Sequence, residues 1–173
     1  MRFILATLLL TFSLSANASH HRGHAIALLE QMDQHFKIIL WQMDQYESKC
    51  DLDAYQQRQV DVVRGYSSRL ITWLPYFRND MISGDLETMR RKFSQPNPSG
   101  MQSVSSIMSA TLHHARQLVG KCPAGDADLS GAIARISWAW ALIDQVVWHV
   151  DDAIREEVYM DPVFICSGPN NHC

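Results

Sequence analysis

Residues 25–50, AIALLEQMDQHFKIILWQMDQYESKC, contain the periodicity that decides the fold class. Their apolar side chains recur at steps that alternate between four and three residues. The stripe comprises Ala25, Leu29, Met32, Phe36, Ile39, Met43, Tyr46 and Cys50. A strand would alternate every two residues, so a helix is the regular structure that gathers these side chains on one side. The stretch therefore predicts a long amphipathic helix at about residues 24–49.

Three further stripes with the same spacing follow along the chain. The second comprises Val60, Val63, Ser67, Leu70, Leu74 and Phe77. The third comprises Met101, Val104, Met108, Thr111, Ala115, Leu118 and Cys122, and the fourth Leu129, Ile133, Ile136, Trp140, Ile143, Val147, Val150 and Ile154. They predict helices at about 53–79, 100–121 and 127–159, with a short extra helix at 85–93 before the third. Asp51 or Asp53 is expected to cap the second helix, and Asp126 or Asp128 the fourth.

Four amphipathic helices joined by short links predict the fold class. Short links make neighbouring helices run antiparallel, so that four apolar stripes can close around one core. We therefore expect an all-α protein, a single up-down-up-down four-helix bundle over residues 19–160. The remaining residues, 161–173, contain prolines, a glycine and two asparagines, and predict an irregular tail that contains a disulfide.

The first 18 residues have the pattern of a secretory signal. Arg2 is followed by an apolar run from Phe3 to Phe12 and then by small residues ending in Ala16-Asn17-Ala18. This order of charged, apolar and small residues predicts cleavage after Ala18. The apolar run is shorter than the roughly 20 residues needed to span a bilayer, and no later segment predicts a membrane span. We expect an exported protein, from a bacterial periplasm or secreted.

The four cysteines lie after the predicted cleavage site, at Cys50, Cys122, Cys166 and Cys173. An even number in an exported chain predicts two disulfides. In an up-down-up-down bundle, the ends of the first and third helices lie at the same pole, which favours Cys50–Cys122 and leaves Cys166–Cys173 to close a small loop. First and third helices are diagonal in the simplest bundle, so other pairings stay open.

Composition and motifs argue against several classes of function. The formal charge is −3, and loss of Arg2 makes it slightly more acidic, so nucleic acid is not an expected partner. Paired Glu-x-x-His motifs for a di-metal centre and a Gly-x-Ser-x-Gly elbow for hydrolysis are both missing from the sequence. We therefore expect a protein without enzymatic activity.

The predicted new N-terminus, Ser19-His20-His21, suggests a metal-binding hypothesis. A free amine, two deprotonated amides and the imidazole of the third residue can surround Cu(II) or Ni(II) in one plane, a geometry that these metals favour. Here His21 holds the third place, and His20 and His24 could add ligands. Ser19, His20, His21 and His24 are therefore the candidate metal residues, and no other cofactor is expected.

A weaker hypothesis is a haem held inside the bundle. Met32 of the first helix and His149 of the last would lie at comparable depth in the predicted topology. However, His149 falls between Val147 and Val150 on an outward position of the predicted stripe, and the chain has no C-x-x-C-H attachment motif.

The tryptophans suggest the main functional hypothesis, a non-enzymatic binding or interaction protein. Trp138 and Trp148 lie off the predicted stripe and close to three helical turns apart, with Leu142 between them. Exposed tryptophans often anchor a partner surface. The expected partner is another protein or a second copy of the chain, and inhibitor, immunity-type, chaperone and sensor roles all fit.

Overall fold

The computed structural model describes residues 2–94 and 103–160, with side chains described for residues 20–94 and 103–157. This part of the chain contains five α-helices, one short 3₁₀ helix and no strand. The elements are α1 (Arg2–Lys49), α2 (Ala54–Ser83), α3 (Leu86–Ser94), α4 (Val104–Arg116), η1 (Pro123–Gly125) and α5 (Asp126–Met160). The prediction of an all-α protein is confirmed. None of the described helices combines the length and apolar character needed to cross a membrane.

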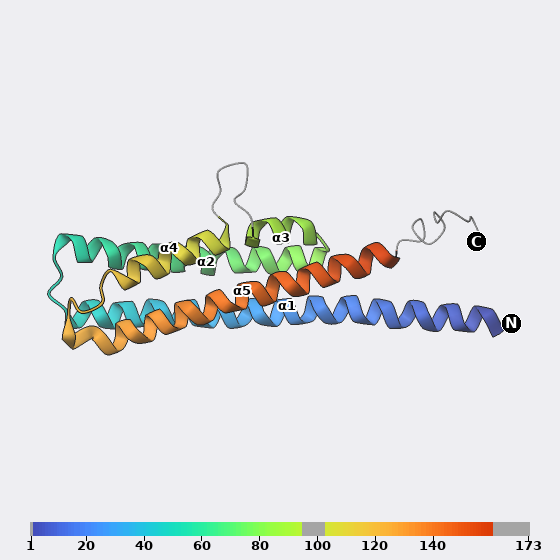
Figure 1. Cartoon of the computed structure of the whole chain (residues 1–173), viewed down its shortest axis with the longest axis horizontal. Coiled ribbons are helices and arrows are strands. Elements are labelled where there is room, and N and C mark those ends of the chain that lie inside the picture. Colours follow the sequence, from blue (N-terminus) through green and yellow to red (C-terminus); the bar gives the residue numbers. More distant parts are fainter. Residues whose placement is uncertain (1, 95–102, 161–173) are drawn as a thin grey trace.

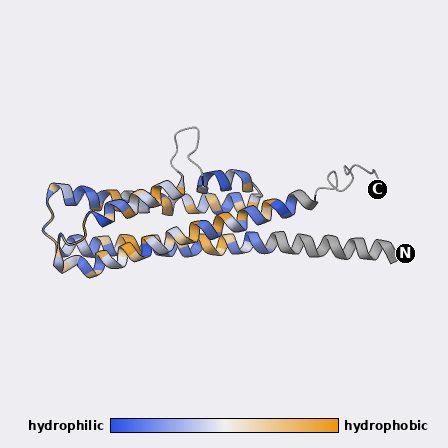
Figure 2. Ribbon diagram, viewed as in Figure 1, coloured by the Kyte–Doolittle hydropathy of each residue, from blue (hydrophilic) through white to orange (hydrophobic). Residues whose placement is uncertain are grey.

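The two longest helices, α1 and α5, run side by side along most of their described length (Figure 1). α2 packs against α1, while α4 contacts both α2 and α5. The short helix α3 covers α5, α2 and α4, and it buries Leu86, Met89 and Phe93 as its spacing predicts. Along each ribbon, hydrophobic and hydrophilic residues alternate, as expected for helices with one buried side (Figure 2).

Local sequence explains where α2 begins and ends. Asp53 accepts a hydrogen bond from the backbone N–H of Gln56, and the Gln56 side chain accepts one from the backbone N–H of Asp53. This reciprocal capping box satisfies two backbone donors that a helix start would leave free. Gly84 ends the helix at φ +84°, a conformation that glycine adopts without steric cost. Of the two predicted caps, the structure uses Asp53.

The third predicted helix is shorter than expected. α4 ends at Arg116, and residues 117–120 form turns that contain Gly120 at φ +71°. Leu118 is still buried and belongs to the hydrophobic core. The predicted start at residue 100 lies outside the described residues. Asp126 and Asp128 lie in the first turn of α5. Their negative charges interact favourably with the positive end of the helix dipole and stabilise the helix.

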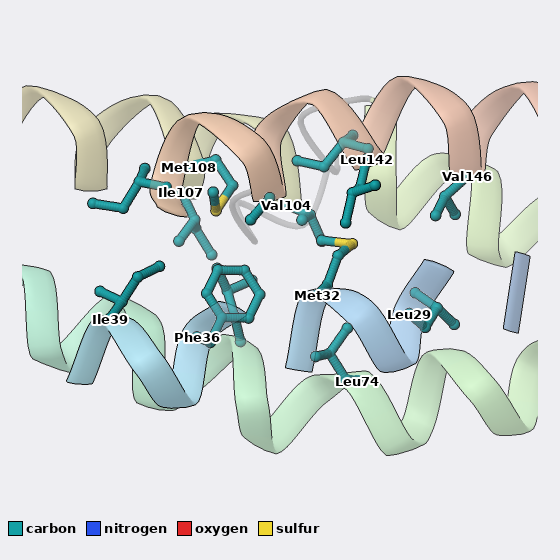
Figure 3. Close-up of a cluster of buried hydrophobic side chains, with 14 of the residues drawn as sticks. Leu29, Met32, Phe36, Ile39, Leu74, Val104, Ile107, Met108, Leu142 and Val146 are labelled. Carbon is teal, nitrogen blue, oxygen red and sulfur yellow. The ribbon is translucent and has the colours of Figure 1, made fainter. Parts of the chain in front are cut away.

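The core confirms the stripes of the first two helices. Every predicted position of α1 from Ala25 to Tyr46 is buried, and so is every predicted position of α2. Figure 3 shows side chains from α1, α2, α4 and α5 meeting around Phe36 and Met32. The described part of the third stripe is buried as well, apart from the half-buried Cys122.

The stripe of α5 differs from the predicted one at every second position. The buried residues are Leu129, Ala132, Ile136, Ala139, Leu142, Ile143, Val146, Val150 and Ala153. The predicted Ile133, Trp140, Val147 and Ile154 are half-buried beside this stripe. Alanine lets two helix backbones approach closely, so the small residues occupy the contact and the bulky ones flank it. The buried side of α5 is therefore centred on its alanines rather than on the neighbouring large residues.

The predicted Cys50–Cys122 disulfide is present, with its Cα atoms 5.8 Å apart. Both cysteines lie beyond the helix ends, Cys50 directly after α1 and Cys122 just before η1. The short non-helical segments bring the two sulfurs together even though the backbones of α1 and α4 are not adjacent. The expected Cys166–Cys173 bridge lies outside the described residues.

Candidate metal centre

Three polar contacts between α1 and α5 involve positions that are separated by multiples of seven residues along each helix. His21, His35 and Lys49 of α1 meet His149, Arg135 and Asp128 of α5, respectively. The residue numbers rise along one helix as they fall along the other, as antiparallel packing requires. In a helix, residues seven apart lie on the same side, two turns from each other. This arrangement places His21 of α1 beside the last turns of α5.

Four histidines gather at this end of the α1–α5 contact. The Nδ1 atoms of His21 and His149 lie 2.9 Å apart, across 128 residues of sequence. The Nε2 atoms of His20 and His24, one helical turn apart, are separated by 3.0 Å. In each pair one ring nitrogen donates a hydrogen bond and the other accepts it. The cluster therefore consists of two imidazole pairs.

The two pairs are themselves in contact. His24 stacks on His149 with ring centroids 5.1 Å apart and an interplanar angle of 8°. The centroids of His20 and His24 lie 4.2 Å apart, those of His21 and His149 5.2 Å, and those of His20 and His21 5.9 Å. Each of the four rings thus contacts two others. We call this group the histidine cluster: His20, His21, His24 and His149.

Charged and aromatic side chains surround the cluster. Glu156 Oε1 lies 3.8 Å from His21 Nε2, and Arg22 forms an ion pair with Glu157. The Trp148 ring stands edge-on to both His149 and His21, with centroid distances of 4.6 and 5.5 Å.

Burial lowers the pKa of His149 below its usual value of 6.5. The positive charges that His21 and His24 can carry lower this pKa further, whereas the Asp152 carboxylate acts in the opposite direction. His149 therefore keeps a neutral imidazole, with a free lone pair, to lower pH than an isolated histidine. A neutral imidazole is the form that ligates a metal.

As the side chains lie, no three His, Cys, Asp or Glu residues within the described part of the chain form a group that could hold a metal ion. The ring nitrogens of the histidine cluster approach one another only in pairs, at 2.9 and 3.0 Å. Metal binding at the cluster therefore needs the rings to turn about their side-chain bonds.

Three of the predicted metal residues, His20, His21 and His24, are brought together, and the side chain of Ser19 lies outside the described part. The fourth member, His149, was missed as a partner of the N-terminal histidines. It was assigned to an outward position because the predicted stripe of α5 followed the large residues Val147 and Ile154. The buried Val146 and Ala153 instead turn His149 toward α1.

The predicted partner surface is not continuous. Trp138 is 65% exposed and Trp148 is 53% exposed, as expected, but Leu142 is only 6% exposed. Leu142 lies seven residues from both Arg135 and His149, on the side of α5 that faces α1, and belongs to the core. The prediction that Leu142 belongs to an exposed partner surface was therefore wrong. Trp148 is exposed, but its ring lies against His21 and His149.

The geometry also separates the two candidate haem ligands. His149 contacts His21, which lies 11 residues before Met32, or about 16 Å along α1 at 1.5 Å per residue. Met32 is fully buried among apolar side chains of the core (Figure 3). The two residues therefore do not face each other across the bundle interior at one depth.

The histidine pair of α4 has a structural environment instead. His114 Nδ1 lies 2.6 Å from the side-chain oxygen of the buried Gln59, which identifies Nδ1 as the donor. Burial, followed by the charge that His113 can carry, lowers the pKa of His114. The contact between His114 and Gln59 joins α4 to α2. The side chain of His113, in contrast, is exposed.

Comparisons with models of protein families, with curated proteins and with solved structures found no match for this chain.

Proposed function

We propose that this protein is an exported helical bundle that binds a divalent transition metal, Cu(II) in preference to Ni(II), through the histidine cluster. The observation that carries this proposal is the 2.9 Å separation of the His21 and His149 Nδ1 atoms. Two imidazoles from opposite ends of the chain meet there, and imidazole is a preferred ligand of Cu(II) and Ni(II). Cu(II) binds such sites most tightly among the divalent first-row metals.

The pairs in the cluster are separated by 2.9 and 3.0 Å, the ordinary length of a hydrogen bond between ring nitrogens. Coordination of one metal ion by four imidazoles therefore requires the rings to turn away from these hydrogen-bonded positions. The proposed geometry of the bound state is a square plane, which Cu(II) favours.

The proposed setting is a periplasmic or secreted four-helix bundle. In it α1, α2, α4 and α5 run up, down, up and down, and α3 caps one side. The Cys50–Cys122 disulfide supports an oxidising compartment, where such bonds persist. Cleavage after Ala18 would free the Ser19 amine beside the cluster. Amine coordination with His21 would then compete with the cluster, because it uses the same imidazole.

The metal proposal predicts a specific loss of affinity on substitution of His149. Isothermal titration of the exported protein with Cu(II), after its N-terminus has been identified by mass spectrometry, is expected to show one tight site. His149→Ala should weaken it at least 10-fold, because one of four ligands and its pairing with His21 are lost. His113→Ala removes an exposed histidine far from the cluster along the chain and should leave the affinity unchanged.

Two further results decide between coordination modes. Electron paramagnetic resonance of the Cu(II) complex is expected to show coupling to imidazole nitrogens, and acetylation of the N-terminal amine should leave it intact. If His149→Ala binds Cu(II) as tightly as the parent protein does, the cluster is not the site. Loss of binding on acetylation alone would assign it to the N-terminal amine.

A second proposed function is capture of another protein, or of a second copy, through exposed tryptophans. Trp138 and Trp41 are 65% and 58% exposed, which favours this idea. Trp138→Ala is expected to weaken self-association or partner binding at least 10-fold, as a central tryptophan of an interface does. Sedimentation equilibrium and pull-downs from periplasmic extract measure it, and helicity by circular dichroism is the control. Unchanged association would rule out Trp138 as a binding residue.

A further inference from the structure

We infer that the outer side of the α1–α5 pair is an interface at which this chain binds a second copy of itself. The inference rests on the second proposed function, association through exposed tryptophans, and deepens it, because it names the partner and defines the surface. It follows from the way in which charged residues are distributed around the two helices.

The register of α1 and α5 decides which residues lie on the outer side of the pair. His35 of α1 faces Arg135 of α5, with Nδ1 and Nη1 3.4 Å apart, and both side chains are half-buried between the helices. An antiparallel helix pair has a local two-fold axis, so equal offsets from two facing residues lie on the same side of the pair. One residue further along, Phe36 and Ile136 are both buried, which identifies that side as the core. A step of three residues turns about 60° the other way, so residues three and six positions beyond the facing ones, and their heptad repeats, lie on the outer side.

These outer positions define a surface that extends across both helices, which run side by side in Figure 1, and we call it the outer face. On α1 it comprises Ala27, Gln31, Gln34, Ile38, Trp41 and Gln45. On α5 it comprises Ala127, Ala134, Trp138, Ala141, Gln145 and Trp148. All of these residues are exposed or half-buried, and Trp138, at 65% exposed, lies near the middle of the α5 row.

The outer face differs from the other exposed side of α1 in its charge. None of the residues of the outer face is Asp, Glu, Lys or Arg, although these types make up 19% of the chain. The exposed side of α1 next to α2 carries Glu30, Lys37 and Asp44. There Glu30 pairs with Arg78 of α2, and Asp44 pairs with Arg64. Depletion of charged residues around an exposed tryptophan is typical of the centre of a protein–protein interface.

A second copy of the chain is the partner that the outer face fits best. The chain is acidic, with a formal charge of −3, and two copies can meet without repulsion where neither carries a charge. A glutamine amide both donates and accepts hydrogen bonds, so Gln31, Gln45 and Gln145 can pair with the same residues across a two-fold axis. A membrane surface is a poorer partner, because helices that lie on membranes carry Lys and Arg beside their apolar side.

The size of the outer face is sufficient for a dimer. Each row covers about 20 residues, or about 30 Å at 1.5 Å per residue, and two helices side by side are about 20 Å wide. The face therefore offers about 600 Å² from each copy, and a dimer would bury about 1,200 Å² in total, the lower limit for a specific interface. This size predicts a dimer that dissociates reversibly.

Sedimentation equilibrium of the exported protein, from micromolar concentration upward, is expected to show monomers in equilibrium with dimers. Ala141→Glu places a carboxylate in the outer face and should raise the dissociation constant of the dimer at least 10-fold, because the charge would be buried without a partner. Ala54→Glu makes the same change at an exposed position of α2, outside the face, and should leave the constant unchanged. Circular dichroism verifies that both variants keep the helicity of the parent.

The outcomes separate this inference from the second proposed function. A parent chain that stays monomeric overturns the inference, and so does a dimer that Ala141→Glu leaves as tight as before. If the monomeric parent captures another protein and Trp138→Ala abolishes the capture, the inference fails while the second proposed function stands. If Ala141→Glu weakens the dimer but Trp138→Ala does not, the interface stands without the tryptophan. Binding of a monomeric parent to phosphatidylcholine vesicles would overturn the inference in favour of a membrane surface.

Discussion

Replacement of both Cys50 and Cys122 by serine is expected to lower the free energy of unfolding by about 4 kcal/mol. The disulfide closes a loop with a sequence separation of 72 residues, and it reduces the entropy of the unfolded chain by an amount that grows with loop length. Domains of this kind are stable by about 5–15 kcal/mol, so the loss removes a large part of the total. Urea unfolding followed by far-ultraviolet circular dichroism measures it.

The packing around the disulfide adds to this expectation. Gly125 of η1 is buried against the Tyr46 ring and Cys50 Sγ, so closely that a Cβ at this position would lie 2.5 Å from the ring and 2.7 Å from the sulfur. The bridge therefore holds η1 against the end of α1, and with it the start of α5. Its loss is expected to loosen this pole first, which hydrogen exchange can locate.

The matched control is the same change at Cys166 and Cys173. These residues are only seven apart in sequence, so a bridge between them restricts the unfolded chain less, and the expected cost is smaller. Mass spectrometry after thiol alkylation verifies that each variant lacks only the intended bridge. Equal losses from the two pairs would contradict the assignment of the main stabilising bridge to Cys50 and Cys122.

The sequence predicted the buried side of a helix correctly where that side consists of large apolar residues, as in α1. In α1, residues such as Leu29, Phe36 and Met43 alternate with charged and amide side chains, so hydropathy alone identifies the buried side. The disulfide followed from the same periodicity, because it placed Cys50 and Cys122 at one pole. Both features depend on local spacing, which a single sequence contains.

The histidine cluster could not be found in the same way, because it depends on how α5 is rotated about its axis. Ala132, Ala139 and Ala153 contribute little hydropathy, yet they are buried because the helices approach closely there. If the alanines are buried, His149 faces α1, whereas if the neighbouring large residues were buried it would face solvent. Packing against α1 determines which of these residues of α5 are buried, and the local spacing of residues does not encode it.

Phe36→Ala is the second change with a large expected effect, about 3–5 kcal/mol less stability. Phe36 is fully buried in α1, and Figure 3 shows its ring at the centre of the core, beside Met108 and Ile107 of α4. Truncation loses the transfer free energy of the ring and leaves a cavity that the surrounding helices fill only in part. Urea unfolding of the variant measures the loss.

Trp41→Ala is the matched control, since it removes a larger aromatic ring from the same helix five residues further on. Trp41 is more than half exposed, so its loss should change stability by about 0.5 kcal/mol or less. Similar losses from the two variants would mean that α1 does not bury the side containing Phe36. The rotation of α1 about its axis would then differ, and with it the register that brings His21 to His149. The stability of these two variants therefore tests the packing on which the metal proposal depends, without any metal in the experiment.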